Sequence, residues 1–236
     1  MTRRPAPRAP VRKPAGNPAQ AVRTGPAARA KAPAPLLAGA AGIRLHTADG
    51  ARKYVTAAER DTFLREAERA DRQVRTLCMT LAYAGCRLSE ALALTANPVE
   101  LAAGVLVFDT LKKRQEGVLR AVPVPPALLD ALDLVHGIRE RQVRRDNGRG
   151  ERLWPVSCMT GWRAVHAVMQ AAGLDGPQAS PKGLRHGFGV AAVSAGIPLN
   201  LVQKWLGHAQ LTTTAIYADA VGAEEKDIAR RMWGDG

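Results

Sequence analysis

The sequence predicts a mainly helical domain with one small antiparallel β-sheet, an α+β fold. Two patterns carry this prediction. Apolar residues recur at helical spacing along most of the chain, for example at Val74, Leu77 and Leu81, which is typical of amphipathic helices. Around residues 105–110 the period changes to two, as expected of a β-strand with one buried face.

The first helices are marked by the residues at their ends. Thr56 and Glu59 have the spacing of a capping box, so a helix is expected to begin at Thr56. A second helix is expected to lead into a turn at Gly85. A third should follow that turn, with Ser89 and Glu90 in its first turn.

A β-hairpin is expected after these helices. Residues 105–110 alternate in polarity, a polar turn lies at 115–117, and residues 118–125 form the returning strand. Pro123 cannot donate a backbone hydrogen bond, which places that strand at a sheet edge. Further helices are expected over residues 126–145, 159–174, 184–196, 198–208 and 223–233.

Composition divides the chain into two parts. Residues 1–51 are rich in Ala, Pro and Arg and are interpreted as a flexible basic tail, and residues 52–236 as the folded domain. The net charge of +13 suggests a polyanionic partner, but nine Lys/Arg and one acid fall in the first 50 residues. The tail either contacts phosphates without sequence preference or has no essential role.

Several classes of protein are excluded. No apolar run approaches the roughly 18 residues that span a bilayer, and no secretory leader is recognised. Three cysteines without a CxxC motif argue against a disulfide framework and a structural zinc site, and favour a reducing cytoplasm. Phosphate-loop, dinucleotide, HExxH, EF-hand and GxSxG motifs are absent. No metal or other cofactor is therefore expected.

What the sequence does concentrate is cationic and imidazole chemistry near a phenol. Four separated segments carry it: "AGCRLSEAL" with Arg87, "TLKKR" with Lys112 and Lys113, "SPKGLRHGF" with Lys182, Arg185 and His186, and "LGHAQLTTTAIY" with His208 and Tyr217.

In this order and spacing, over about residues 52–236, the four segments resemble the catalytic domain of the tyrosine recombinase (phage integrase) family. That family has an Arg in A-G-x-R-x-S-E, a Lys on a β-hairpin, His-or-Lys-x-x-Arg-His, and Leu-Gly-His ahead of a Tyr nucleophile. The resemblance implies the architecture of that catalytic domain. It also implies a site-specific DNA recombinase (integrase), which breaks and rejoins strands through a 3′-phosphotyrosyl intermediate without metal or ATP.

The resemblance assigns roles to the two arginines and the tyrosine. Arg87 and Arg185 would clamp the non-bridging oxygens of the phosphate, which guanidiniums bind two at a time, and Tyr217 would be the nucleophile. Lys182 stands where the family most often has His, so which group accepts the tyrosine proton stays open. Lys182 either accepts it, with a pKa lowered by neighbouring arginines, or acts only through its charge.

The remaining roles follow from the same resemblance. Lys112 is expected to protonate the departing 5′ oxygen, with Lys113 as the alternative because adjacent strand residues face opposite ways. His208 would hydrogen-bond a non-bridging oxygen or steer the nucleophile. Glu90 is expected to orient a cation, and His186 to pack or bond locally.

The implied partners are double-stranded DNA recombination sites, a homotetramer on synapsed DNA and accessory DNA-bending proteins, in a bacterial cytoplasm at the nucleoid. The family usually carries an N-terminal core-binding domain of about a hundred residues, for which the first 50 residues here are too few. The chain is thus either a single-domain recombinase or a degenerate remnant of a mobile element. Alternative functions are DNA relaxation like that of a type IB topoisomerase, non-catalytic DNA binding, and binding of a partner other than DNA.

Overall fold

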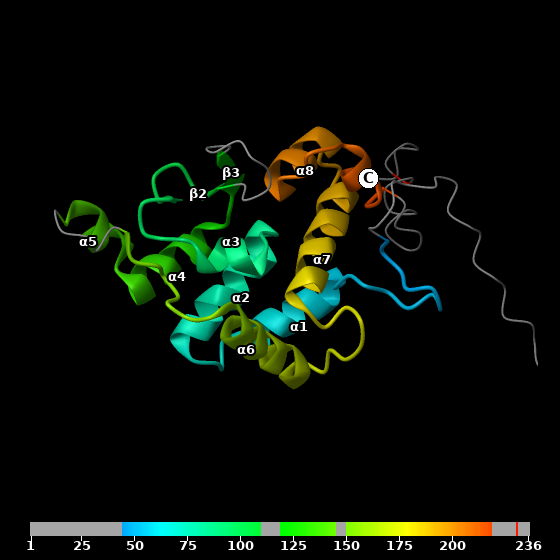
Figure 1. Cartoon of the computed structure of the whole chain (residues 1–236), viewed down its shortest axis with the longest axis horizontal. Helices are drawn as coiled ribbons and strands as arrows, with labels where there is room; N and C mark the ends of the chain where they lie inside the picture. The colour runs from blue at the N-terminus through cyan, green and yellow to red at the C-terminus, as the bar shows by residue number, and fades with distance from the viewer. Residues whose placement is uncertain (1–43, 110–118, 145–149, 219–229, 231–236) are drawn as a thin grey trace, which may run out of the picture. The chain divides into compact units, whose positions relative to one another are not determined.

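The computed structural model describes residues 44–109, 119–144, 150–218 and 230, all within one compact unit of the chain. These residues confirm a helix-rich fold with a small antiparallel sheet (Figure 1). The elements are α1 (Ala57–Ala67), α2 (Arg72–Ala84), α3 (Leu88–Leu92), β1 (Val99–Glu100), β2 (Val105–Asp109), β3 (Leu119–Pro123), α4 (Pro126–His136), α5 (Ile138–Val143), α6 (Cys158–Ala171), α7 (Pro181–Ser194), α8 (Leu199–Leu206) and α9 (Thr212–Ala215).

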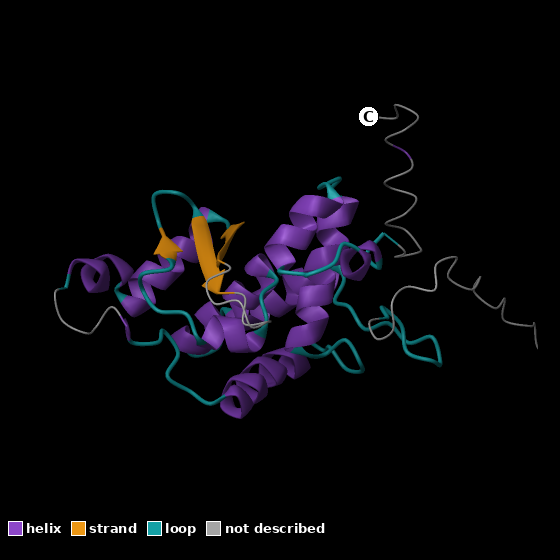
Figure 2. Ribbon diagram, turned by 45° about the horizontal axis from the view of Figure 1, so that its top comes forward, coloured by secondary structure: helices purple, strands orange, loops and turns teal. Residues whose placement is uncertain are grey.

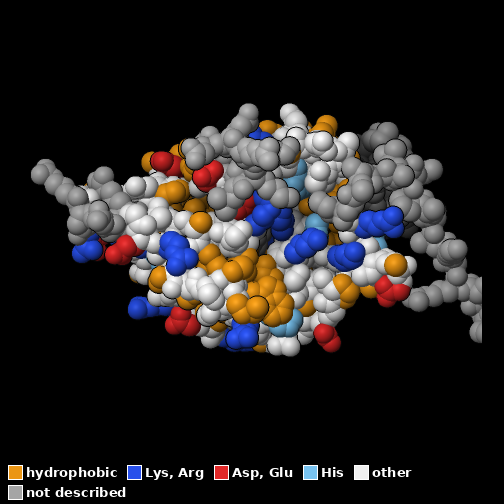
Figure 3. Space-filling view, in the orientation of Figure 1, with side chains coloured by type: hydrophobic (Ala, Val, Ile, Leu, Met, Phe, Trp, Pro, Cys, Tyr) orange, Lys and Arg blue, Asp and Glu red, His pale blue; other side chains and the backbone are white. Residues whose placement is uncertain are grey.

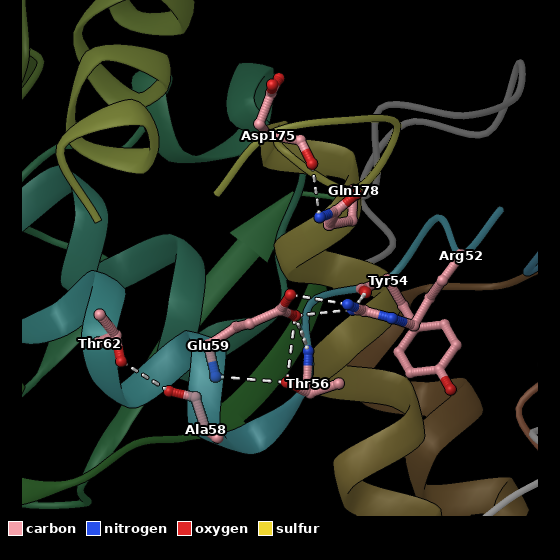
Figure 4. A network of polar contacts seen from close by, with 8 residues as sticks. All are labelled: Arg52, Tyr54, Thr56, Ala58, Glu59, Thr62, Asp175 and Gln178. Atoms are coloured by element: carbon pink, nitrogen blue, oxygen red, sulfur yellow. Dashed lines mark hydrogen bonds and ion pairs between the residues drawn. The ribbon is translucent and has the colours of Figure 1, made fainter. Parts of the chain in front are cut away.

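Helix α1 begins where the capping box predicts. The Glu59 backbone N–H donates to Thr56 Oγ1 at 3.3 Å, and the Thr56 N–H donates to Glu59 Oε2 at 2.8 Å. The Arg52 guanidinium binds both oxygens of Glu59, at 2.6 and 2.7 Å, and donates to the Tyr54 carbonyl (Figure 4). This network fastens the segment ahead of α1 to the first turn of the helix.

The turn between α2 and α3 is the one expected at Gly85. Gly85 has φ +57°, the left-handed conformation that glycine adopts without steric cost. A Cβ at Gly85 would lie 2.5 Å from Phe188 Cδ1, so glycine also lets α7 approach the turn. Arg87 follows as the N-cap residue of α3.

The sheet has the order β1-β2-β3, and both strand pairs are antiparallel (Figure 2). Phe108 lies opposite Arg120 in the β2–β3 register. Strand β3 lies at the edge, as Pro123 predicts. The two-residue strand β1 was not expected, because so short a strand shows no alternation. The hairpin tip with Lys112 and Lys113 lies outside the described residues.

The prediction of one helix over residues 126–145 is wrong. Gly137 has φ +61° and donates its N–H to the Asp133 carbonyl at 2.7 Å, so α4 ends there and α5 starts afresh. Helix α7 begins at Pro181, ahead of the expected residue 184, because Ser180 caps it. Helix α9 was not expected. The helix predicted over 223–233 lies outside the described residues except for Arg230.

The core is centred on α2, which packs against α1, α4, α6 and α7. A second cluster of buried side chains lies along α7 and α8 and consists of Leu45, Tyr54, Val190, Val202, Leu206 and Tyr217. Tyr217 is therefore part of a packed cluster next to α7. In the described part of the chain no helix is both long enough and apolar enough to cross a membrane.

Candidate active site

A cleft of about 1230 Å³ opens among α3, β3, α6, α7 and the segment from α8 to Tyr217. Lys and Arg side chains, with His beside them, gather on this face between α3 and α7 (Figure 3). Five of the six predicted site residues line the cleft: Arg87, Lys182, Arg185, His208 and Tyr217. They come from three separate segments that the fold brings together. The sixth, Lys112, lies outside the described residues.

Arg185 is buried at the back of the cleft, with 6% of its surface exposed. Its guanidinium donates to the Gly85 carbonyl at 2.8 Å and to the Leu206 carbonyl at 2.5 Å. Burial, and next the positive charge of Arg87, lowers its pKa to about 10, which still leaves it charged at neutral pH. Two backbone carbonyls thus fix the direction in which this cation points.

Arg87 is oriented by Glu90, as expected. Arg87 Nη1 lies 2.6 Å from Glu90 Oε1, and the Arg87 N–H donates to Oε2 at 2.7 Å. Burial raises the pKa of Glu90, but the hydrogen bond and charge of Arg120, followed by the backbone and charge of Arg87, bring it below its ordinary value. Glu90 is therefore an anion held between two arginines.

Arg120 on β3 completes this network and was not predicted as a site residue. Its Nη2 and Nη1 lie 2.6 and 3.2 Å from the two Glu90 oxygens, and its Nε donates to the Trp205 carbonyl at 2.9 Å. Its guanidinium lies 5.0 Å from the centre of the Phe108 ring. The sequence held a signal for it: in the alternation of the strand, Arg120 shares the inward face with Val122. A charge at an inward position needs a buried partner.

Tyr217 packs its ring against α7, where glycine makes room for it. A Cβ at Gly189 would lie 2.6 Å from Tyr217 Cζ. The Tyr217 hydroxyl lies 3.2 Å from His186 Nδ1. Burial raises the pKa of Tyr217 to about 12, although the charges of Arg185 and Arg87 act in the opposite direction. The phenol is accordingly protonated at rest.

His208 follows the left-handed Gly207 that ends α8. Its ring is nearly parallel to the Tyr217 ring, at an interplanar angle of 17° and a centroid distance of 6.1 Å. His208 Nδ1 lies 2.9 Å from Thr214 Oγ1. Burial, followed by the charge of Arg185, lowers the pKa of His208 to about 3, so this imidazole is neutral at pH 7.

Lys182 and His186 lie on successive turns of α7 but in different surroundings. The Lys182 side chain is exposed at the mouth of the cleft. His186 is buried, with 4% of its surface exposed, and bonds locally, as expected. Its Nε2 is buried and has no hydrogen-bond partner among the described residues.

The site joins fixed cations, neutral imidazoles and a phenol. Guanidiniums bind anionic oxygens, and a phenol is a nucleophile once its proton is removed. This arrangement can bind a phosphodiester and attack it. Within the described ranges, no group of three or more His, Cys, Asp or Glu side chains could hold a metal ion.

Comparisons with known proteins agree with this chemistry. Tyrosine recombinase XerD of Mycobacterium leprae is 33% identical over 156 residues, which cover 61% of this chain and 46% of XerD. Tyrosine recombinase XerA of Pyrococcus furiosus is 29% identical over 166 residues, covering 66% of this chain and 54% of XerA. The chain thus spans about half the length of these curated relatives.

Solved structures show the same fold. A crystal structure of XerA recombinase has a TM-score of 0.64 at 21% identity, covering 76% of this chain and 64% of that one. The XerH recombinase bound to its difH substrate before cleavage has a TM-score of 0.60 at 23% identity, covering 81% and 55%. The predicted tyrosine-recombinase architecture is confirmed. The model of the phage integrase family matches residues 53–223, most of the chain, and the chain therefore belongs to that family.

Proposed function

We propose that this chain is a site-specific DNA recombinase that cuts and rejoins DNA strands through a covalent 3′-phosphotyrosyl intermediate, without metal or ATP. One observation carries the proposal. The two arginines, the lysine, the histidine and the tyrosine that the sequence singles out lie around a single cleft. The membership of the chain in the phage integrase family supports the same function.

The two arginines bind the scissile phosphate. Arg185 is fixed by two carbonyls and Arg87 by Glu90, so neither has to reorganise when negative charge develops on the phosphorane. Such preorganised donors stabilise a transition state strongly, and removing one costs about 10²–10³ in rate. Lys182, exposed at the mouth of the cleft, adds positive charge next to the phosphate.

Tyr217 supplies the nucleophile. Its Oη forms a bond to phosphorus as the bond from phosphorus to the 5′ oxygen breaks. Lys112, or Lys113 in its place, donates a proton to that leaving oxygen. His208 is neutral and donates to a non-bridging oxygen while its ring keeps the Tyr217 ring in place. A 5′ hydroxyl from a second strand then reverses the reaction, and the energy of the broken bond is retained in the phosphotyrosyl ester.

The partners belong to the same proposal. The XerH relative is bound to a DNA substrate in its solved structure, which supports double-stranded recombination sites as the ligand here. Exchange between two sites would take place in a homotetramer, with accessory DNA-bending proteins, at the nucleoid of a bacterial cytoplasm. The division into a basic tail, residues 1–51, and a catalytic domain, residues 52–236, stays a prediction.

The test is formation of a covalent adduct. The chain is incubated with a nicked duplex that carries inverted repeats flanking its coding region, and protein-linked DNA is measured after denaturation. We expect an adduct that Tyr217→Phe abolishes. Tyr83→Phe is the matched control, because Tyr83 packs against the main core on α2, and it should leave the adduct intact. An adduct that survives Tyr217→Phe would refute the assignment.

Two alternatives have their own readouts. A plasmid with two sites should give recombinant products. Relaxation of supercoils without recombinants would favour an activity like that of a type IB topoisomerase. DNA binding without an adduct would favour a non-catalytic remnant of a mobile element.

A further inference from the structure

The Tyr217 hydroxyl has one hydrogen-bond partner in the described part of the chain, and that partner is His186. The distance from Tyr217 Oη to His186 Nδ1 is 3.2 Å, and both side chains are buried. Lys182, the other group on α7 that could accept a proton, is exposed and forms no hydrogen bond with that hydroxyl among the described residues. The geometry therefore separates the two candidates.

A phenol hydroxyl can donate or accept, and the role of a His ring nitrogen depends on its tautomer. Transfer of the Tyr217 proton requires that the hydroxyl donates and that His186 Nδ1, the acceptor within its reach among the described residues, accepts. The imidazole then carries its own proton on Nε2, the buried nitrogen. In this tautomer Nδ1 holds a free electron pair directed at the proton that must leave.

We propose that His186 is the catalytic residue that accepts the Tyr217 proton during strand cleavage, and that Lys182 contributes charge only. This inference rests on the proposed function and names the proton acceptor of that site. The proton passes from Tyr217 Oη to His186 Nδ1 as Oη bonds to phosphorus, and the 5′ oxygen leaves with a proton from Lys112, or from Lys113 in its place. His186 becomes an imidazolium and returns the proton to Oη when the strand is rejoined, so the step is balanced in both directions.

The electrostatics of the site agree with this role. Burial, followed by the charges of Lys182, Arg185 and Lys53, lowers the pKa of His186 to about 4, so the imidazole is neutral at pH 7 and has one ring nitrogen able to accept a proton. So weak a base does not ionise a resting phenol. As Oη gives electron density to phosphorus, however, its proton becomes far more acidic, and transfer to a weak base becomes favourable within the same step. The incoming phosphate also offsets the surrounding positive charge.

The experiment uses His186→Asn in the full chain. An asparagine amide reaches the position of Nδ1 and can accept the hydrogen bond but not the proton. With the nicked duplex in excess, we expect the rate of adduct formation to fall by about 10²–10⁴, the range that general acid–base catalysis contributes. The affinity for the duplex, measured by fluorescence anisotropy, should not change.

A sulfur-substituted substrate distinguishes proton acceptance from donation. A 5′-bridging sulfur leaves without needing a proton, so it should restore the rate of the chain that lacks the proton donor, Lys112→Ala or Lys113→Ala. Sulfur should not restore the rate of His186→Asn, because that variant lacks the acceptor for the proton of the Tyr217 nucleophile. Restoration of His186→Asn by sulfur, or a His186→Asn chain as fast as the unsubstituted chain, would overturn the inference while leaving the proposed function intact. An unsubstituted chain that forms no adduct would refute the proposed function and the acceptor role together.

A second measurement needs no variant. The ¹⁵N chemical shifts of the His186 ring in the free chain report which nitrogen carries the proton. We expect an unprotonated Nδ1. A proton on Nδ1 would overturn the inference whatever the kinetics show.

Discussion

Replacement of Arg120 by methionine tests the buried ion pair that supports the site. Arg120 is 3% exposed and binds both oxygens of Glu90, at 2.6 and 3.2 Å. Arg120→Met keeps an unbranched apolar stem against Phe108 but leaves the Glu90 carboxylate buried with Arg87 as its remaining cation. The perturbation is thus an uncompensated charge rather than a cavity.

The expected magnitude follows from that charge. Removing one partner of a buried ion pair costs about 3–5 kcal/mol, and the 2.6 Å contact between Arg87 and Glu90 places the expected loss near the lower end, about 3 kcal/mol. A chain of this size loses about 2–4 °C in Tm per kcal/mol, so Tm should fall by roughly 6–12 °C. Because Glu90 orients Arg87, the rate of adduct formation should fall as well.

The assay is thermal and urea unfolding followed by circular dichroism, with a matched control. Arg139→Met removes an ion pair of similar length, 2.8 Å to Asp133, but Arg139 has 74% of its side chain exposed, so its loss should cost about 0–1 kcal/mol. The double variant Glu90→Met with Arg120→Met removes both charges and should recover much of the stability, though not the rate. A cost of Arg120→Met no larger than that of Arg139→Met would refute the reasoning.

Three further predictions follow from the same structure. Gly189→Ala should slow adduct formation and destabilise the fold, because its Cβ would lie 2.6 Å from the Tyr217 ring. Gly150→Ala is the control for both measurements, since no atom of the described residues lies within 4 Å of the added Cβ. The pKa of His186 is about 4 in the fold against 6.5 for a free imidazole, so the unfolded chain takes up the proton first. Stability should therefore fall as pH drops from 6.5 towards 4, by about 2 kcal/mol from this residue at pH 5; a urea midpoint that stays constant over this range would contradict it. Cys158 is the exposed thiol and lines the cleft. A thiol-alkylating reagent should therefore modify Cys158 in the folded chain and modify it less once duplex DNA occupies the cleft, as measured by mass spectrometry. Equal labelling with and without DNA would count against the cleft as the binding site.

Local residue chemistry accounts for much of the agreement between sequence and structure. The capping box at Thr56, the turn at Gly85 and the strand edge at Pro123 depend on neighbouring residues, and each is confirmed. The break at Gly137 was missed because the apolar pattern continues on both sides of it. A glycine inside a helical pattern is either tolerated or a C-cap, and local spacing does not distinguish the two.

The motif segments are predictable for a related reason. Arg87, Arg185, His208 and Tyr217 each occupy a distinctive local pattern, and the order of those patterns marks the family without any coordinates. Arg120 belongs to no such motif. The alternation of β3 marks it as an inward-facing charge, but its partner Glu90 is 30 positions away in the chain and is identified only when β3 meets α3.

By itself the sequence determined the family, the helix-rich fold with its small sheet, and five of the residues that line the cleft. The tertiary structure alone decided how those residues are used. It buried Tyr217 against Gly189, set Arg120 against Glu90, and put His186, rather than Lys182, against the phenol hydroxyl. The physical reason is that a motif specifies which side chains are present, whereas hydrogen bonds and charges act over a few ångströms between segments that only the folded chain brings together.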